Sequence, residues 1–239
     1  MPSGKKPTKK KSGAKSVRSV PTSDMTPQER EKKVVFRGQT ITYEEQLTLE
    51  DLEKEAHKNI GNYENHEAKD YDFAYKADNG KVTKLEIRDV GIKRVPESIK
   101  NLKSLVDLTL SYNKLTTLPE SIGDLKSVAE ILLHGNQLIA LPDSMGGLES
   151  LRRLWLQDNK LTELPNSLLI LPKLKDLEIK NNPLNKASIK IWEQVMKQTG
   201  RMEDINATEK AALEDLEKII GEPIPRVDQN FRDFGYLAE

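Results

Sequence analysis

Three histidines are the side chains best suited to acid–base chemistry in this chain of 239 residues, because it contains no cysteine. That absence excludes disulfides, thiolate metal sites and cysteine nucleophiles. His57 lies on a predicted helix and His66 in a polar loop, and we expect both to be solvated. His134 stands 23 residues from Ser111 and from Gln157, but this set lacks the carboxylate that would orient a catalytic histidine. The histidines therefore predict no nucleophilic catalysis.

Other signatures of catalysis are weak. The glycines form neither a G-x-x-x-x-G-K loop nor a G-x-G-x-x-G loop, so no phosphate-binding motif is present. No set of candidate ligands has the clustering that a metal site needs. Glu130 and Glu178 would lie about 10 Å apart if their segments were strands two ~4.8 Å steps apart, a separation at which carboxylates can act as a pair. We expect an open surface without a deep pocket around them, and hence a protein that is not an enzyme and has no cofactor or metal.

Charge divides the chain into two unequal parts. The 38 basic and 38 acidic residues give a net charge of zero, which argues against a nucleic-acid surface over the whole chain. Residues 1–20 nevertheless carry seven basic residues and no acidic one. Because this stretch has few large apolar side chains, residues 1–33 are predicted to be a disordered tail. The tail either keeps the protein soluble or acts as an electrostatic tether to nucleic acid or an acidic surface, through Lys5, Lys6, Lys9, Lys10, Lys11, Lys15 and Arg18.

Targeting signals are missing from this sequence. No apolar run reaches the ~18 residues of a membrane span. The basic residues near the start are not followed by the apolar region of a secretory signal. We therefore expect no membrane span and a cytoplasmic location.

A repeat of 23 residues dominates the middle of the sequence. Its frame is L-x-x-L-x-L-x-x-N-x-L-x-x-L-P, and it runs most regularly from Leu105 to Pro165. An earlier copy has Val90 in place of the asparagine, and a later copy leaves the frame at Ala187. The prolines and asparagines that mark the period are Pro96, Pro119, Pro142 and Pro165, and Asn113, Asn136, Asn159 and Asn182.

Alternation within the frame is typical of a half-buried strand. Leu108 and Leu110 alternate with Asp107, Thr109 and Ser111. Strands at a fixed spacing should stack in parallel, with the leucines forming one continuous core. The asparagine side chains should bond to the backbone of neighbouring turns, and the L-P dipeptide should end each strand and begin the return segment.

These motifs resemble the leucine-rich-repeat family, in the 23-residue subclass with L-P-x-S-I/L at the coil boundary. The pattern is similar to that of intracellular Ras-binding SUR-8 type scaffolds and their prokaryotic relatives. The resemblance covers residues 82–187, which would form five coils. It implies an α/β solenoid with a curved parallel β-sheet on its concave face, helical caps, and use in protein binding. It specifies the fold more closely than the function, which depends on variable positions.

A solenoid needs caps to cover its core at both ends. The N-terminal cap should span residues 34–81, beginning with a small hairpin at Val34–Ile41. A capping box at Thr42-x-x-Glu45 predicts a helix to about Lys58. The alternation of Tyr71, Phe73 and Tyr75 before Asn79-Gly80 predicts a strand and a turn into the first repeat.

The C-terminal end should be covered by a helical cap over residues 188–221, whose first helix runs from Lys186 to Gln198. Residues 222–239 resemble the start of a second N-terminal cap. L-E-D-L-E-K occurs at both 49–54 and 213–218, and D-F-A-Y-K-A-D at 72–78 returns as D-F-G-Y-L-A-E at 233–239. Either residues 208–239 are a cap whose repeats are missing, or the two ends independently evolved similar helix–strand caps.

The outward positions of the repeat strands should line the concave face. One row across the sheet places two large apolar residues, Leu132 and Trp155, next to each other. An exposed apolar patch indicates binding, and Trp and Arg are enriched among residues that dominate binding energy. The alternative is that Trp155 packs over Leu132 and fills the groove without a partner. The predicted contact patch is Trp155, Leu132, Arg153, Tyr112, His134, Thr109 and Gln157.

The concave charges are of both signs, which suits a protein partner better than the uniformly basic track that nucleic acid requires. We therefore predict a monomeric, non-catalytic scaffold or adaptor that binds a folded protein on the concave face. The resemblance implies signalling and a small GTPase as a partner class. The alternative is a nucleic-acid or ribonucleoprotein accessory protein tethered by the basic tail.

Overall fold

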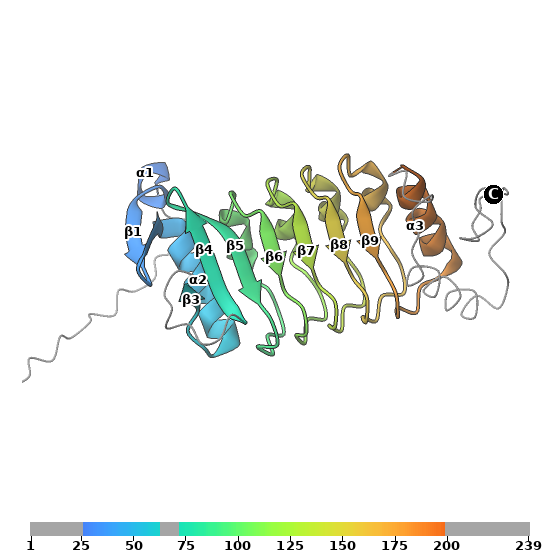
Figure 1. Cartoon of the computed structure of the whole chain (residues 1–239), viewed down its shortest axis with the longest axis horizontal. Helices are drawn as coiled ribbons and strands as arrows, with labels where there is room; N and C mark the ends of the chain where they lie inside the picture. Colours follow the sequence, from blue (N-terminus) through green and yellow to red (C-terminus); the bar gives the residue numbers. More distant parts are fainter. Residues whose placement is uncertain (1–25, 63–71, 199–239) are drawn as a thin grey trace, which may run out of the picture.

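The computed structural model describes residues 26–62 and 72–198. Within them, one curved row of strands is backed by a row of short helical turns, as Figure 1 shows. A helical cap lies at each end of the row. The predicted tether residues, from Lys5 to Arg18, and the possible second cap at 208–239 lie outside the described residues.

The N-terminal cap begins earlier than the predicted residue 34. A one-turn helix, α1 (Pro27–Arg30), lies inside the segment that was expected to be disordered to residue 33. Thr26 accepts a hydrogen bond from the Glu29 backbone, and the Glu29 side chain accepts one from the Thr26 backbone, which makes a complete capping box. The prediction of a disordered tail rested on the basic residues nearby and overlooked the capping box of Thr26 and Glu29. The hairpin that follows is confirmed as β1 (Lys33–Phe36) and β2 (Gln39–Thr42).

The predicted cap helix is confirmed as α2 (Tyr43–Ala56), and its capping box joins it to the first repeat strand. The Glu45 carboxylate accepts hydrogen bonds from the Thr42 backbone and hydroxyl at 3.0 and 2.8 Å. Its other oxygen accepts the Val82 backbone N–H at 3.0 Å. Since Glu45 is only 1% exposed, these bonds compensate a buried carboxylate and fix the angle between cap and solenoid.

The main sheet has seven strands in the order of the chain. A left-handed turn at Asn79 and Gly80 joins β4 and β5 as an antiparallel hairpin, and the later strands all pair in parallel. The register advances by one repeat at each step, so that Lys84, Asp107, Glu130, Arg153 and Asp176 are neighbours. The strands are β3 (Gly61–Asn62), β4 (Phe73–Asp78), β5 (Lys81–Ile87), β6 (Asp107–Thr109), β7 (Glu130–Leu132), β8 (Arg153–Trp155) and β9 (Asp176–Glu178).

The return segments are short 3₁₀ turns on the opposite side from the strands, and each begins directly after a proline of the repeat. They are η2 (Glu97–Asn101), η3 (Glu120–Asp124), η4 (Asp143–Gly147) and η5 (Asn166–Ile170). Leucines from strands and turns meet between the two layers in one continuous core. Helix α3 (Lys186–Gln198) covers the last coil, where the Trp192 indole donates to the Leu177 carbonyl at 3.0 Å.

The repeat asparagines form the predicted ladder of side-chain hydrogen bonds. Asn159 donates to the carbonyls of Leu133 and Leu156, at 3.0 and 2.9 Å, and accepts the Leu138 backbone N–H at 3.0 Å. Asn182 repeats this pattern one coil later. Each asparagine thus joins its own coil to the preceding one. These bonds fix the strand register and, with it, the rows of side chains on the concave face.

A candidate protein-interaction surface on the concave face

The sheet register places the predicted apolar neighbours side by side. Leu132 and Trp155 are paired positions on β7 and β8, and both are half-buried. Glu86 and Glu178 stand at the two ends of the same row. This row is therefore apolar at its centre and acidic at its ends.

Three aromatic rings extend the patch across successive coils. The centroids of the Tyr112 and His134 rings are 4.9 Å apart in an edge-to-face arrangement, and those of His134 and Trp155 are 6.0 Å apart. Tyr112 has a left-handed backbone and is 54% exposed, so its ring is the most accessible of the three. Its ring lies over Gly135, where a Cβ atom would stand 2.6 Å from Tyr112 Cδ1. Glycine is thus needed at position 135 for the aromatic contact.

Arg153 holds Trp155 in place. Its guanidinium bonds Glu130 at 2.7 Å and Asp176 at 3.2 Å, and it lies over the indole ring at 5.6 Å. The indole N–H also points to Asp176, at 3.4 Å. These contacts, from strands on both sides, make Trp155 a pre-positioned contact residue, which lowers the entropy that binding must overcome. They also engage Glu130 in an ion pair, which argues against a role as one of two catalytic carboxylates.

Two members of the predicted patch are not available to a partner as expected. Thr109 is 6% exposed and His134 is 9% exposed. Side chains converge on a concave sheet, so the short Thr109 lies below its longer row neighbours, and the His134 ring lies between Tyr112 and Trp155. The accessible patch consists of the exposed Tyr112 and the half-buried Leu132, Arg153 and Trp155, and Gln157 lies beside it with similar burial.

The burial of His134 has an electrostatic consequence. Burial lowers the pKa of the His134 imidazole, the positive charge of Arg88 lowers it further, and Asp158 partly opposes the shift. The ring is therefore neutral at pH 7, as befits a side chain packed between two aromatic rings.

Acidification should destabilise the fold through His134. Because the pKa of His134 is lower in the folded protein than in the unfolded chain, the unfolded chain takes up a proton at a higher pH. The contribution of neutral His134 to the free energy of unfolding is therefore present above about pH 6.5 and is lost as the pH falls below it. We expect His134→Gln to remove this contribution. The melting-temperature difference between the wild type and the variant should be flat above neutral pH and shrink toward pH 5. His57→Gln, at an exposed position, is the control, and a pH-independent difference for His134→Gln would contradict the assignment.

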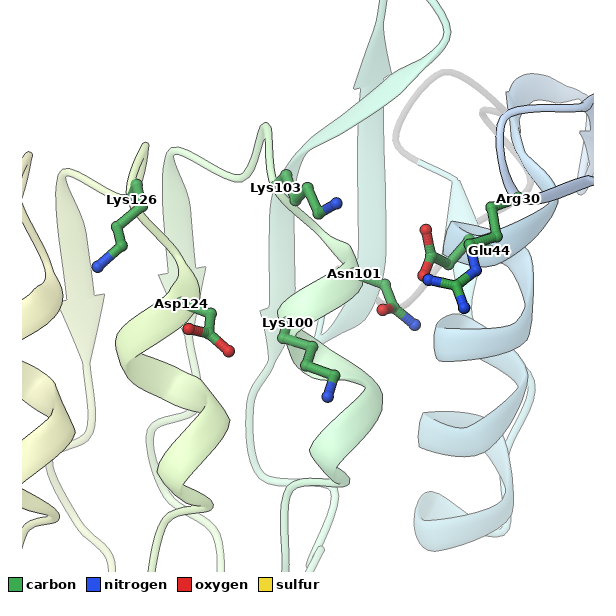
Figure 2. Close-up of a pocket in the computed structure, with 7 residues that line it drawn as sticks. All are labelled: Arg30, Glu44, Lys100, Asn101, Lys103, Asp124 and Lys126. Carbon is green, nitrogen blue, oxygen red and sulfur yellow. The ribbon is translucent and has the colours of Figure 1, made fainter. Parts of the chain in front are cut away.

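A second hollow lies between the N-terminal cap and the 3₁₀ turns, with a volume of about 560 Å³. Figure 2 shows that cap residues and the first two turns contribute its lining. The lining of this hollow contains four cationic side chains and two carboxylates. The buried amide of Asn101 donates to Thr48, and the Lys126 ammonium donates to the Gly147 carbonyl. The lining is Arg30, Glu44, Lys100, Asn101, Lys103, Asp124 and Lys126. Among the described residues, the hollow has no apolar or aromatic side chain in its lining, so the concave patch is the stronger candidate for a protein-binding surface.

The described part of the chain contains no cluster of three or more His, Asp or Glu side chains that could hold a metal ion. Among the same residues, we find no helix with the length and apolar character needed to cross a membrane.

Comparison with known families identifies the fold. The family model described as a leucine-rich repeat region matches residues 81–229, more than half of the chain. The chain therefore belongs to the leucine-rich-repeat family, and its sheet, turns and caps form the α/β solenoid that the sequence predicted. Domains of this family generally serve as protein-interaction scaffolds and are generally non-catalytic. No curated protein matches the chain.

Solved structures that match part of this chain include proteins from bacteria and plants. A leucine-rich-repeat protein of Leptospira interrogans is 31% identical over 46% of this chain and 28% of its own, with a TM-score of 0.42. YopM from Yersinia enterocolitica is 35% identical over 42% of this chain and 20% of its own, with a TM-score of 0.37. The BIR3–SERK2 complex of Arabidopsis thaliana contains a chain that is 24% identical, covering 59% of this chain and 81% of its own, with a TM-score of 0.47. The chain spans less than a third of the two bacterial proteins.

Sequence reasoning missed the charge network around Arg153, although the repeat contained the signal. In a 23-residue register, the positions before and after Arg153 are Glu130 and Asp176, both of opposite charge. A comparison of charges at 23-residue intervals would therefore have predicted that ion pairs hold Arg153 in place.

Proposed function

We propose that the protein is a non-catalytic scaffold that binds a folded protein partner through the concave patch of Tyr112, Leu132, Arg153 and Trp155. The observation that carries this proposal is the half-buried Leu132–Trp155 pair, flanked by an exposed tyrosine and braced by Arg153. Aromatic residues and arginine at the centre of a patch, with charged residues around them, are typical of protein interfaces.

The test is capture of partners by the full chain and by the variant Leu132→Ala/Trp155→Ala. Loss of a central contact typically costs more than 2 kcal/mol of binding, so recovery of a specific partner should fall by more than about tenfold. The variant should remain folded, because both side chains are only half-buried. Ile139→Ala/Ile170→Ala is the matched control, since it removes two exposed aliphatic side chains away from the concave strands. Equal capture by both variants would contradict the proposal.

For the class of partner, the resemblance of the L-P-x-S-I/L boundary to Ras-binding scaffolds supports testing small GTPases first, and with them a role in signalling in the cytoplasm. Purified GTPases in the GDP- and GTP-bound states can be compared in the same assay. Failure to bind them would reject this partner class and leave the concave patch to be tested with the captured proteins.

A further inference from the structure

Just after the ends of strands β5 to β8, a second row of residues buries polar atoms that have no hydrogen-bond partner within residues 26–62 and 72–198. They are Arg88 Nε, Ser111 Oγ, His134 Nδ1 and Gln157 Oε1. Their residues follow one another at the 23-residue period and belong to successive coils. We call these four residues the polar row. An unpaired buried polar atom costs about 1–3 kcal/mol, and most such atoms in proteins find a partner.

The packing of the repeat does not explain the polar row. Three convex serines, Ser121, Ser144 and Ser167, also bury an unpaired hydroxyl, but there the residue type is constant. Successive turns approach closely at that position, since a Cβ on Gly146 would lie 2.9 Å from Ser167 Cβ, so a small side chain is needed. The polar row contains four different residue types of very different size. Apolar side chains would avoid the cost of unpaired polar atoms there, which indicates that the polarity serves another purpose.

Two side chains at the polar row are partly exposed. The Tyr112 ring packs against His134 and over Gly135, yet it is 54% exposed. The Arg88 side chain is 43% exposed, and its Nε lies 3.9 Å from Glu86. A partner on the concave face can displace these side chains by rotation about single bonds, without disturbing the sheet.

We propose that the polar row hydrogen-bonds an extended segment of the protein partner that crosses the strands and places a carboxylate at Arg88. This inference rests on the proposed function and adds to it the chemistry of the bound segment. Because adjacent parallel strands are about 4.8 Å apart, successive residues of the polar row are spaced by about the same distance. An extended peptide chain has C=O and N–H groups along its length that can bond to them. Arg88 and Ser111 can donate to carbonyl or carboxylate oxygens, and Gln157 Oε1 can accept an N–H.

Charge complementarity supports an acidic segment. The row that includes these residues continues to Lys180 and contains no carboxylate, so its charged members are Arg88 and Lys180. The neighbouring row, Glu86, Thr109, Leu132, Trp155 and Glu178, carries two carboxylates and no basic residue. The row beyond it, Lys84, Asp107, Glu130, Arg153 and Asp176, carries more acidic than basic residues. A carboxylate would therefore meet less repulsion along the polar row than along these two rows, although Glu86 already lies 3.9 Å from Arg88 Nε.

The experiment selects short random peptides displayed on phage against the full chain and measures their affinity for variants. The dissociation constant of a selected peptide should be about tenfold higher or more for the variant Ser111→Ala/Gln157→Leu than for the wild type, because two hydrogen bonds to the peptide are lost. Its melting temperature should equal or exceed that of the wild type, because two unpaired buried atoms are removed. The matched control is Ser144→Ala/Ser167→Ala, which removes two unpaired hydroxyls from the convex side and should leave affinity unchanged. Enriched peptides should contain Asp or Glu.

The outcomes separate this inference from the proposed function. In one outcome, peptides bind Ser111→Ala/Gln157→Leu with wild-type affinity but fail to bind Leu132→Ala/Trp155→Ala. In that case the polar row is not a recognition element, and the proposal of a concave scaffold stands. If both variants bind as well as the wild type, both proposals fail. If no peptide is enriched, the inference of an extended segment is overturned, and the concave patch is decided by the partner capture described above.

Discussion

Leu156→Ala should lower the free energy of unfolding by about 2–5 kcal/mol, the range for deleting a buried leucine side chain. Leu156 is completely buried in the middle of the continuous core. The loss should be near the upper end of this range, because the strands and turns around it are fixed by backbone and asparagine bonds and have little freedom to collapse into the cavity. Urea unfolding followed by circular dichroism measures the change.

The control for Leu156→Ala is Ile139→Ala. Ile139 has the same number of carbon atoms in its side chain but is 53% exposed, so its removal should cost less than about 1 kcal/mol. A similar loss of stability in the two variants would show that the core is not the continuous, tightly packed layer described above.

The fold could be predicted from the sequence because its information is local and repeated. A 23-residue frame with leucines at alternating positions specifies which residues form a strand and which side chains point inward. It also places residues 23 positions apart side by side on adjacent strands, so the register of Glu130 with Arg153 can be predicted from the spacing. Thr42 and Glu45 similarly specified the start of α2. The segment at Thr26–Arg30 was misread because overall charge was given priority over a capping box four residues long.

Side-chain burial on the concave face was less predictable. Counting positions correctly places Thr109 and His134 on that face, but does not tell how far they lie below their neighbours. That depends on the curvature of the sheet and on the length of side chains one coil away, as with Tyr112 over Gly135. Such contacts join residues 23 positions apart and become visible only when the coils are assembled. Counting thus predicts the face on which these residues lie, but the exposure expected for Thr109 and His134 is wrong.

The same assembly explains how an open sheet can present a defined surface. In a solenoid each coil contacts only its neighbours, so local order depends on the interface between adjacent coils. The ladder of asparagines and the pairing of Arg153 with residues of both flanking strands act at these interfaces. The concave patch spans three coils, and its geometry is thus only as well defined as the bonds that join them.

Asn136→Ala should therefore be among the most damaging polar substitutions in the chain. The Asn136 amide donates to the carbonyls of Leu110 and Leu133, both at 2.9 Å, and its oxygen accepts the Leu115 backbone N–H at 3.1 Å. Alanine would leave the buried Leu115 N–H without a partner, which costs about 1–3 kcal/mol. The carbonyls of Leu110 and Leu133 would each lose one bond but keep a donor, from Asn113 and Asn159. We therefore expect a loss of about 1–3 kcal/mol. The urea transition should also broaden, because two of the three groups belong to the preceding coil.

Two further variants test whether the amide itself is responsible. Asn136→Asp keeps the size of the side chain but replaces the amide donor by an oxygen that faces two carbonyls, so it should destabilise at least as much as alanine. Asn166→Ala removes an exposed asparagine and should change the free energy of unfolding by less than about 0.5 kcal/mol. If Asn136→Asp were as stable as the wild type, the donated bonds would not hold the coils together. A sharp transition in Asn136→Ala would instead mean that leucine packing alone couples them.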